Sequence, residues 1–264
     1  MLENATRSWH EMPDKSDRLV VVSGGGTGIG RAIAVRLGSQ ADTVAIIGRR
    51  VERLAAVAAE LERKVGLRRV MTIVADLSEP AEVRQAADEI TALGREVDIL
   101  VNNAGGNLAP FPAEDLEGMR DDWLANITGN VLPAVLLTQA LLPVIRQPNG
   151  RIITIGSVAA VRGPATYGGA KAALHPWSVE LAAQLASRGV TVNMLAPGYI
   201  TGTEFYGQRM SAEFHAGRAQ QSPMNRGGTI EEVAAAVEYL AGPDAGFITG
   251  QVIHINGGAL LGRV

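Results

Sequence analysis

Short runs of aliphatic and β-branched residues alternate with amphipathic stretches along almost the whole chain, and no linker interrupts the alternation. The stretch 51–65, for example, places Leu54, Val57 and Leu61 at helical spacing. Strands that alternate with helices of this length indicate βαβ units and a parallel sheet with helices on both faces. We therefore expect a single α/β domain built on a doubly wound, mainly parallel, seven-stranded sheet. Its expected strands span 19–23, 43–48, 70–75, 98–101, 151–156, 191–195 and 251–255.

Two segments depart from this alternation. Residues 1–18 are polar and mixed in charge, so we expect an N-terminal extension before a domain that spans 19–264. Residues 202–226 are polar with scattered aromatic side chains, and they separate the sixth expected strand from the next helix. Ligands of open α/β sheets bind beyond the carboxyl ends of the strands. We therefore predict a substrate lid near 202–225, with an ordinary surface loop as the alternative.

Composition excludes several classes of protein. The 264 residues include no cysteine, which rules out disulfides, cysteine metal sites and a thiol nucleophile. The net charge of -3 provides no basic footprint for nucleic acid or an anionic membrane, and the four scattered histidines form no metal-ligand set. The start lacks the apolar core of a signal peptide, and the most apolar stretch, 131–145, is broken by polar residues and two prolines. We expect a soluble cytoplasmic protein that binds no metal, membrane or nucleic acid.

A glycine motif, SGGGTGIG at 23–30, follows the first expected strand and opens a helix. Its Gly24, Gly28 and Gly30 have the spacing Gly-x-x-x-Gly-x-Gly. A turn without Cβ atoms lets the backbone approach a pyrophosphate, and the helix N-terminus adds free N–H groups and the positive end of the helix dipole. We predict a Rossmann-type dinucleotide site that includes Thr27 and Ile29, with a tight turn that binds no ligand as the alternative.

The end of the second expected strand indicates which dinucleotide binds. Gly48 stands where a site for NAD(H) usually has an acidic residue, and Arg49 and Arg50 follow it. A guanidinium group binds a 2′-phosphate through paired hydrogen bonds, whereas a carboxylate repels one. We therefore predict NADP(H) as the preferred cofactor, with Arg49 as the phosphate contact, Arg50 solvated and NAD(H) as the alternative. After the third expected strand, Asp76 would accept from the adenine amino group and Leu77 would cover the ring, unless Asp76 only caps the next helix.

Tyr167 and Lys171 lie four residues apart in a segment expected to be helical to about residue 188, so they share a helix face. A neighbouring ammonium group favours the phenolate and lowers a tyrosine pKa from its usual value of about 10, which suits acid–base catalysis. Ser157 stands just after the fifth expected strand, where the intervening loop can bring its hydroxyl to the same carbonyl oxygen as Tyr167. Each feature alone is common on protein surfaces, but the set together indicates carbonyl/alcohol redox chemistry.

In this order and spacing, the motifs resemble those of the short-chain dehydrogenase/reductase family over essentially all of residues 19–258. The resemblance implies a Rossmann fold and hydride transfer between NADP(H) and a ketone or secondary alcohol, without a metal. The matching segments are SGGGTGIG at 23–30, Asp76, NNAG at 102–105, Asn126 in WLANITGN, ITIGS ending at Ser157, Tyr167 with Lys171, Pro197 with Gly198, and FITGQVIHINGG at 247–258.

The resemblance also implies a role for each catalytic residue. Tyr167 would be the general acid in reduction and the general base in oxidation. Lys171 would bind the nicotinamide ribose and lower the pKa of Tyr167, and Ser157 would hold the substrate oxygen. Asn126 would anchor a water molecule that links Lys171 to solvent as a proton relay.

Further implied contacts surround the cofactor. Thr201-Gly202-Thr203 replaces the single threonine that the family pattern has after the sixth strand, so Thr201 and Thr203 both remain candidates for the nicotinamide carboxamide. The family also implies a homotetramer, with helices around 120–146 and 167–188 at the main interface. The remaining implied contacts are Asn103, Ala104 and Gly105 on the adenosine and ribose side, and Pro197, Gly198 and Ile200 beside the nicotinamide.

The interval between Ser157 and Tyr167 is shorter than in many relatives, which predicts a reshaped pocket wall, and Asn256 stands where Asp is common. The sequence most resembles 3-oxoacyl-carrier-protein reductases and related alcohol dehydrogenases. A sugar, polyol or steroid-type dehydrogenase that uses NAD(H) is one alternative, and a nucleotide-sensing protein without turnover is another. A Rossmann methyltransferase has no need of the Tyr167 and Lys171 pair, and the complete catalytic set favours an active oxidoreductase with a small-molecule substrate.

Overall fold

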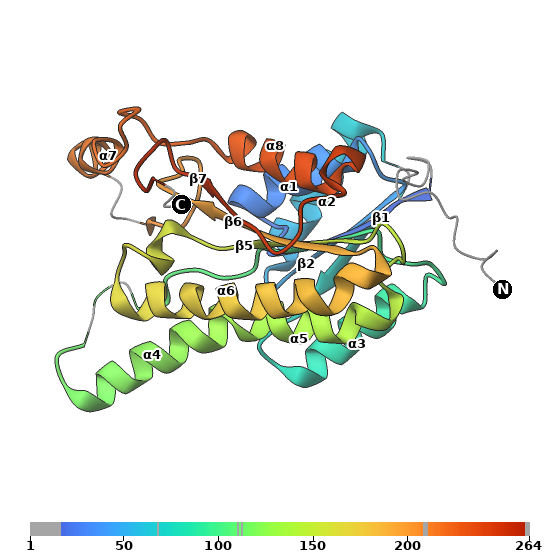
Figure 1. Ribbon diagram of the computed structural model, residues 1–264, viewed down its shortest axis with the longest axis horizontal. Helices are drawn as coiled ribbons and strands as arrows, with labels where there is room; N and C mark the ends of the chain where they lie inside the picture. The colour runs from blue at the N-terminus through green and yellow to red at the C-terminus, as the bar shows by residue number, and fades with distance from the viewer. Residues whose placement is uncertain (1–16, 68, 110, 112, 208–210, 262–264) are drawn as a thin grey trace.

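The computed structural model describes residues 17–67, 69–109, 111, 113–207 and 211–261. Within these residues, seven parallel strands form one sheet in the order β3-β2-β1-β4-β5-β6-β7 (Figure 1). The predicted seven-stranded Rossmann sheet is confirmed, and each strand lies within two residues of its expected bounds. The strands are β1 (Leu19–Ser23), β2 (Thr43–Gly48), β3 (Arg69–Val74), β4 (Ile99–Asn102), β5 (Arg151–Ile155), β6 (Thr191–Pro197) and β7 (Val252–Ile255).

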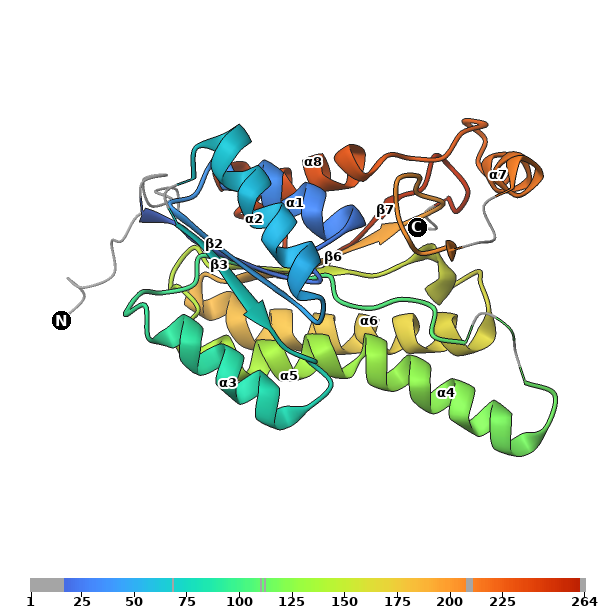
Figure 2. The ribbon, with the colours of Figure 1, turned by 180° about the vertical axis from the view of Figure 1, so that it is seen from behind.

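Helices cover both faces of the sheet, as Figures 1 and 2 show from opposite sides. Helices α1, α2 and α8 pack on one face, whereas α3, α5 and α6 pack on the other, with α4 against α6. The helices are α1 (Gly28–Gly38), α2 (Val51–Val65), α3 (Pro80–Thr91), α4 (Leu116–Asn130), α5 (Leu132–Leu141), α6 (Ala165–Leu185), α7 (Ala212–Ala219) and α8 (Ile230–Ala241). Short 3-10 helices include η2 (Leu142–Val144) after α5, η3 (Val158–Ala160) before α6 and η4 (Ala186–Arg188) after it.

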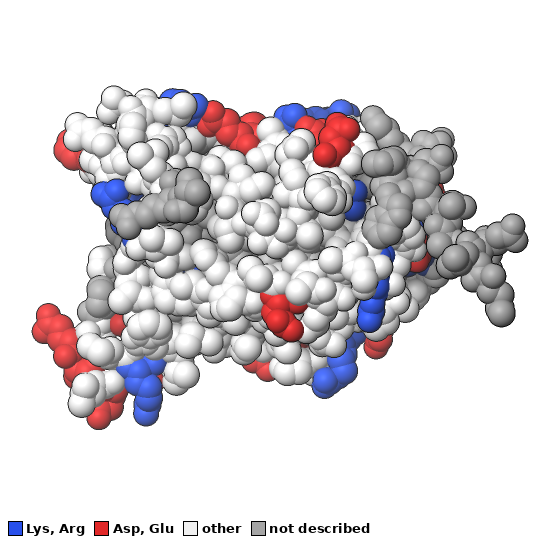
Figure 3. All heavy atoms as spheres, viewed as in Figure 1, with Lys and Arg blue, Asp and Glu red and all other residues white. Residues whose placement is uncertain are grey.

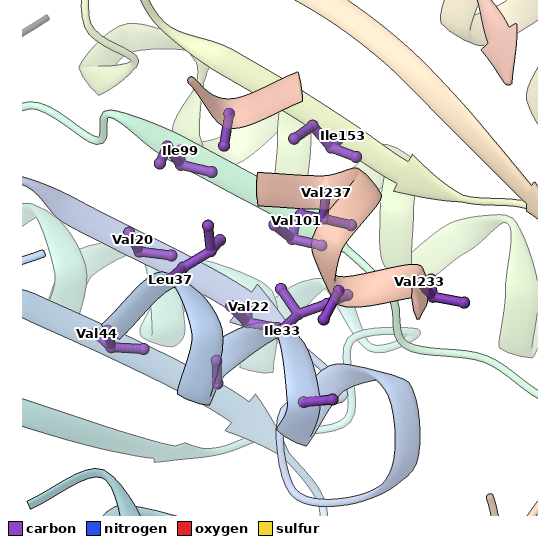
Figure 4. Packing of buried hydrophobic residues seen from close by; sticks show 14 of the residues in the cluster. Val20, Val22, Ile33, Leu37, Val44, Ile99, Val101, Ile153, Val233 and Val237 are labelled. Atoms are coloured by element: carbon purple, nitrogen blue, oxygen red, sulfur yellow. The ribbon is translucent and has the colours of Figure 1, made fainter. Parts of the chain in front are cut away.

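The side chains of β1 alternate between two hydrophobic cores, one on each face of the sheet. Val20 and Val22 pack with residues of α1 and α8 such as Ile33 (Figure 4), whereas Leu19 and Val21 belong to the core on the opposite face. All of these side chains are fully buried. Burial on both faces explains why the strands are almost continuously apolar and why the polar side chains with chemical function follow the strand ends.

The chain order of the strands reverses between β1 and β4, and such a switch point opens a crevice at the carboxyl edge of the sheet. The segment after β6, where the lid is predicted, leads to α7 at the left of Figure 1, beyond this edge. Residues 208–210 of the predicted lid lie outside the described residues. Closure of this segment over a substrate stays a prediction.

Arg18 packs into the sheet domain. The predicted extension, 1–18, falls outside the described residues except for Asp17 and Arg18. Arg18 is buried, and its carbonyl oxygen accepts hydrogen bonds from the N–H groups of Asp42 and Thr43, both at 3.1 Å. Arg18 is therefore part of the folded domain rather than of the extension.

Helix α4 carries apolar side chains that the rest of the fold leaves exposed. Leu116, Leu124 and Met119 are 79%, 54% and 46% exposed. Together α4, α5 and η2 form the run Leu116–Val144, the one helical run among the described residues that is long and apolar enough to cross a membrane, with 33% of its most apolar window buried. The neighbouring surface over α6 also shows few charged atoms (Figure 3). Faces of this kind mark contacts with another apolar surface.

Candidate active site

One large cavity, of about 820 Å³, opens at the carboxyl edge of the sheet and extends from the glycine turn before α1 to the segment after β6. Its size and mixed apolar and polar walls suit an organic ligand. Of the residues singled out from the sequence, Gly30, Asn126 and Thr201 lie outside its lining. The cavity lining brings together Gly24, Thr27, Gly28, Ile29, Arg49, Asp76, Leu77, Asn103, Ala104, Gly105, Ser157, Tyr167, Lys171, Pro197, Gly198, Ile200 and Thr203.

The glycine turn has the geometry that a phosphate group requires. Gly24 and Gly28 have φ of 63° and 52°, in the left-handed region. A Cβ atom on Gly30 would lie 2.1 Å from the carbonyl oxygen of Gly24, so Gly30 serves close packing of α1 rather than contact with the cavity. Helix α1 has no acidic residue in its first turn, and Thr27 makes no side-chain capping bond. The first N–H groups of α1 therefore remain available for an anion.

Asn103 shapes this turn from the end of β4. Its side-chain amide donates hydrogen bonds to the carbonyl oxygens of Ser23 and Gly24, both at 3.1 Å. The hydroxyl of Ser23 in turn accepts from the N–H groups of Asn103 and Ala104, at 2.9 and 3.1 Å. The amide of Asn103 thus holds the turn in place, while Ala104 and Gly105 line the cavity beside it.

Asp76 and Arg49 face each other at the end of the cavity formed by β2 and β3. Arg49 Nη1 lies 3.5 Å from Asp76 Oδ2. Asp76 Oδ1 accepts hydrogen bonds from the hydroxyl of Ser78 at 2.7 Å and from its N–H at 3.0 Å. These two bonds, with a smaller contribution from Arg49, hold the pKa of Asp76 below its usual value. Asp76 therefore organises the start of the loop before α3 and lines the cavity. The capping alternative is wrong, because the N-cap residue of α3 is Glu79, and the contact of Asp76 with adenine stays a prediction.

Two further arginines, not singled out from the sequence as cofactor contacts, stand beside Arg49. Arg50 Nη1 and Arg53 Nη2 each lie 2.9 Å from the carboxylate of Glu204, in the segment after β6. Arg50 Nη2 also donates to the hydroxyl of Thr27 at 3.3 Å. Arg50, expected to be solvated, instead connects the glycine turn to the predicted lid. No short sequence pattern links Glu204 to α2, because the contact forms only when the chain is folded.

Tyr167, Ser157 and Lys171 meet at the opposite end of the cavity. The side chains of Tyr167 and Lys171 are almost completely buried. Burial raises the pKa of Tyr167 well above its usual value, and a hydrogen bond with Ser157 opposes this rise. Burial lowers the pKa of Lys171 to about 8. Lys171 Nζ donates to the carbonyl oxygen of Ile155 at 3.1 Å and lies 5.9 Å from the centroid of the Tyr167 ring.

The direction of the Tyr167 shift differs from the sequence expectation. A neighbouring Lys171 was expected to lower the tyrosine pKa, but the loss of solvent around the phenol outweighs other effects. Part of this burial comes from Phe205, whose ring centroid lies 5.3 Å from that of Tyr167. The phenol is therefore protonated at neutral pH, which is the state that a general acid requires.

The asparagine beside Lys171 is Asn130 rather than Asn126. The side chain of Asn126 donates to the carbonyl oxygen of Asp122 at 3.1 Å and to the hydroxyl of Thr166 at 3.3 Å, and it accepts from the N–H of Leu108 at 3.2 Å. Neither Asn126 nor Asn130 lines the cavity. Asn130, one helical turn later, lies against Gly105, where a Cβ atom would be 2.6 Å from Asn130 Oδ1 and 3.3 Å from Lys171 Nζ.

Asn130 is the last residue of α4, directly before the break between α4 and α5. Helix α4 ends at Asn130 and α5 begins at Leu132. Pro133, which lacks an N–H group, cannot continue the hydrogen bonding of α4 and is favoured in the first turn of α5. Pro133 was thus the sequence signal that could have identified Asn130. The side chain of Asn130 also bonds to both the N–H and the carbonyl oxygen of Gly106, at 3.0 and 2.8 Å.

Of the two candidate threonines, Thr203 faces the cavity. Thr201 donates from its hydroxyl and its N–H to the carbonyl oxygen of Gly228, at 3.1 and 2.8 Å, outside the cavity lining. Gly202 has φ of 76°, a left-handed conformation that turns the chain between the two threonines. Thr203 then packs against Gly28, 3.6 Å from the position of a Cβ atom there. The turn at Gly202 thereby brings a hydroxyl group to the glycine turn of the cofactor site.

The chain matches a family model over most of its length. A model described as enoyl-(acyl carrier protein) reductase matches residues 24–259. Among curated proteins, 3-oxoacyl-(acyl-carrier-protein) reductase FabG of Escherichia coli (strain K12) is 38% identical over 249 residues, covering 91% of this chain and 96% of that protein.

Solved structures extend the comparison to the fold. A short-chain dehydrogenase from Burkholderia cenocepacia J2315, described in complex with NADP, has a TM-score of 0.79 at 36% identity, and the match covers 92% of this chain and 98% of that one. A short-chain dehydrogenase/reductase of Serratia marcescens, solved as a double mutant, has a TM-score of 0.82 at 34% identity, with 92% and 97% covered. These matches each cover more than nine-tenths of this chain.

Proposed function

Because the chain belongs to the short-chain dehydrogenase/reductase family, we propose that it is an NADP(H)-dependent oxidoreductase that interconverts a ketone and a secondary alcohol. One observation carries the proposal. The hydrogen-bonded Tyr167 and Ser157 lie beside the buried Lys171, in the same cavity as a glycine turn with the geometry for dinucleotide phosphates. Proton transfer to a carbonyl oxygen and binding of a dinucleotide are thus provided at the two ends of one site.

The protein supplies the proton chemistry of the reaction. When bound, NADPH supplies the hydride that reduces the carbonyl carbon. Tyr167, protonated at neutral pH because it is buried, donates its proton to the carbonyl oxygen, while the Ser157 hydroxyl donates a hydrogen bond to the same atom. Lys171 binds the nicotinamide ribose and stabilises the tyrosinate after the proton has left. In oxidation, Tyr167 takes the proton back.

Proton supply to Tyr167 runs past Lys171 and Asn130. The family resemblance suggested that Asn126 anchors a water molecule beside Lys171. We assign this role to Asn130 instead, because Asn130 and Lys171 both lie against Gly105. The carbonyl oxygen of Asn126 accepts a hydrogen bond from the Asn130 side chain at 2.9 Å, so Asn126 helps to hold Asn130 in position. Asn130 is therefore a positioning residue for the proton path.

The charges at the end of β2 support NADP(H) rather than NAD(H). Arg49, Arg50 and Arg53 all line the cavity there, and Gly48 occupies the position of the acidic residue that an NAD(H) site needs. A 2′-phosphate is favoured by this concentration of guanidinium groups. The solved relative from Burkholderia cenocepacia, described in complex with NADP, supports the same choice. Thr203, at the other side of the glycine turn, is proposed to bind the nicotinamide carboxamide.

A screen of carbonyl compounds tests this function. Similarity to 3-oxoacyl-(acyl-carrier-protein) reductases supports 3-oxoacyl thioesters as one substrate class, so the panel should contain these with simple ketones and keto-sugars. NADPH oxidation is followed for the wild type and for Tyr167→Phe, which removes the proton donor. The expected result is turnover of at least one carbonyl class by the wild type, and loss of turnover with retained NADPH binding in Tyr167→Phe. Turnover that survives in Tyr167→Phe contradicts the mechanism.

The exposed face of α4 supports a homotetramer as the working form. Leu116, Met119 and Leu124 on α4 and Val179 on α6 are large, apolar and at least 46% exposed in the single chain. Packing against a second copy removes this surface from water, and each buried methylene contributes about 0.8 kcal/mol. We expect the assembled enzyme to be a soluble cytoplasmic protein. Light scattering at the monomer mass would contradict the assembly.

A further inference from the structure

The segment after β6 encloses a guanidinium group in aromatic rings. The rings of Tyr199 and Tyr206 have centroids 5.4 Å apart, and the ring of Phe214 in α7 lies 5.2 Å from that of Tyr206. Arg218, also in α7, places its Cζ 6.0 Å from the Tyr199 centroid and 5.6 Å from the Tyr206 centroid. All four side chains line the cavity that contains Tyr167. The substrate end of the site therefore contains the guanidinium group of an arginine.

Arg218 has hydrogen-bonding capacity that the described part of the chain leaves unused. Arg218 Nη2 donates to the hydroxyl of Tyr206 at 3.4 Å, whereas its buried Nε has no acceptor among the described residues. Arg226, which lines the same cavity, instead forms two hydrogen bonds with the carboxylate of Glu232, at 2.8 and 2.6 Å. No carboxylate within the described ranges forms such a pair with Arg218. A buried donor without an acceptor is unfavourable, so an external anion would be stabilised there.

The charges around the cavity are unevenly divided. Among the described residues, the acidic side chains that line it are Asp76 and Glu204, and both pair with arginines at the cofactor end. The substrate end contains Arg162 and Arg218 with no lining carboxylate in the described part of the chain. This end therefore has a positive potential, which attracts and orients an anionic ligand.

A row of rings separates Arg218 from the reacting hydroxyl groups. The Tyr167 ring contacts Phe205, and the Phe205 ring contacts Tyr206 with centroids 4.9 Å apart. Arg218 lies on Tyr206, at the far end of this row. A ligand that reaches from Tyr167 to Arg218 thus meets an apolar aromatic wall between a hydrogen-bonding end and a cationic end.

We propose that Arg218 forms an anion subsite, and that the substrates are ketones with a carboxylate or phosphate group separated from the carbonyl by an apolar segment. This inference rests on the proposed ketone reduction and adds its substrate class. The carbonyl oxygen lies at Tyr167 and Ser157, the apolar segment lies along Phe205 and Tyr206, and the anion accepts hydrogen bonds from Arg218. The rings of Tyr199 and Tyr206 shield part of the guanidinium group from water, which strengthens those bonds.

Matched ketones test the subsite. The series consists of acetophenone, 4-acetylbenzoate, its methyl ester and 4-acetylphenyl phosphate, which share the reacting carbonyl and differ in charge. The variants are Arg218→Met, which removes the charge, Arg218→Lys, which keeps it, and Arg162→Met as the control for another cation that lines the cavity. Each enzyme is assayed for kcat and KM at saturating NADPH, and comparison of the carboxylate with the phosphate identifies which anion the subsite prefers.

The expected result is a wild-type preference for one of the two anions over the neutral ester and acetophenone. Arg218→Met should lower kcat/KM for the anionic ketone about 10- to 100-fold, mainly through KM, the range expected for hydrogen bonds to a charged group. Acetophenone turnover should remain within about twofold, which also shows that the variant is folded. Arg218→Lys should recover part of the loss, and Arg162→Met should keep most of the preference. Equal losses for charged and neutral ketones, or a preference that depends on Arg162 alone, would overturn the subsite.

Measurements of ligand binding test the anion subsite independently of the proposed reaction. Calorimetric titration with 4-acetylbenzoate and with acetophenone, in the presence of NADP⁺, measures the anion contact without turnover. Absence of reduction of any ketone, combined with carboxylate binding that Arg218→Met abolishes, contradicts the proposed reaction and supports the subsite. A wild-type enzyme that binds and reduces neither anion better than the ester contradicts the subsite alone, provided that neutral ketones are reduced.

Discussion

Glu204 and Arg53 form an ion pair of 2.9 Å that joins the segment after β6 to helix α2 beside the cavity. The same carboxylate pairs with Arg50, also at 2.9 Å. All three side chains are about half exposed, so solvent screens the pairs and each contributes at most about 1 kcal/mol to stability. We therefore expect these ion pairs to affect cofactor selectivity rather than stability, because Glu204 neutralises part of the positive charge that surrounds Arg49.

Replacement of Glu204 by Gln should increase the selectivity for NADPH. Loss of one negative charge beside Arg49, Arg50 and Arg53 favours a cofactor with an extra phosphate, and we expect the ratio of kcat/KM for NADPH to that for NADH to rise about two- to fivefold. The gain should disappear in about 1 M salt, where the Debye length is about 3 Å. Glu62→Gln removes the same charge from an exposed position on α2 outside the cavity lining and should leave the ratio unchanged. A fall in the ratio for Glu204→Gln would contradict this electrostatic interpretation.

Arg49→Asp should shift the enzyme toward NADH. The variant exchanges a phosphate contact for a carboxylate that repels the phosphate and accepts from ribose hydroxyls. We expect the NADPH to NADH ratio of kcat/KM to fall about 10- to 100-fold, as for the loss of a charged hydrogen bond. Arg63→Asp makes the same change at an exposed site of α2 away from the cavity and serves as the control. An unchanged ratio in Arg49→Asp would show that Arg50 or Arg53 binds the phosphate.

Asn130→Ala and Asn126→Ala should have different effects. Asn130 holds the backbone beside Lys171, so its loss should lower kcat about tenfold or more, with a smaller change in KM and a shifted pH profile, since small displacements at a reacting centre reduce rates strongly. Asn126 is fully buried and bonded to Leu108 and Asp122, so its loss should lower stability by about 1–3 kcal/mol with little change in kcat. Steady-state kinetics and denaturant unfolding measure the two effects. A loss of kcat in Asn126→Ala, together with a loss of stability alone in Asn130→Ala, would place Asn126 on the proton path.

The buried Lys171 should make the stability of the cofactor-free protein depend on pH. Its pKa is lowered from 10.5 to about 8 in the folded state, so between these values the unfolded chain retains a proton that the folded protein has released. Stability therefore rises with pH in this window, by at most about 1.4 kcal/mol per pH unit.

Lys171→Met isolates this contribution. The unfolding free energy of the wild type relative to Lys171→Met should increase from pH 8 to pH 10 and remain flat below pH 7, where the lysine is protonated in both states. The comparison should stop near pH 10, because above that value the raised pKa of Tyr167, which both proteins contain, makes each of them less stable as the pH rises. Chemical denaturation at a series of pH values measures both proteins. A constant difference between them across this range would show that Lys171 is not desolvated in the folded protein.

The strands and the chemistry of the site could be predicted from the sequence because both leave local patterns. Strands β1, β2, β4, β5 and β6 are buried along almost their whole length. The glycine turn, Asn103 and Ser157 follow the ends of strands closely. The choice between Asn126 and Asn130 could not be made this way, because positions four residues apart share a helix face. Both asparagines lie within α4, so the position of α4 along α6 in the folded chain determines which of them reaches Lys171.

Contacts between distant segments were the other source of error. The pKa of Tyr167 depends on burial to which Phe205 contributes, and no spacing rule relates these two residues. The pairing of Arg50 with Glu204 depends in the same way on how the segment after β6 returns to α2. The position of one helix along another and the path of the predicted lid are set by the folded chain. Residue propensities and short motifs therefore do not predict them.

The left-handed turn at Gly202 is the junction between the sheet scaffold and the segment that carries Glu204, Phe205 and Tyr206. Thr201 anchors the loop to the backbone of Gly228, and the hand of the next residue, rather than the number of residues, determines that Thr203 reaches the cavity. A substrate segment grafted from another enzyme after Gly202 would keep the contact of Thr201 with Gly228. It would have to supply new partners for Tyr199, whose ring contacts Tyr206 and Arg218 beyond the junction.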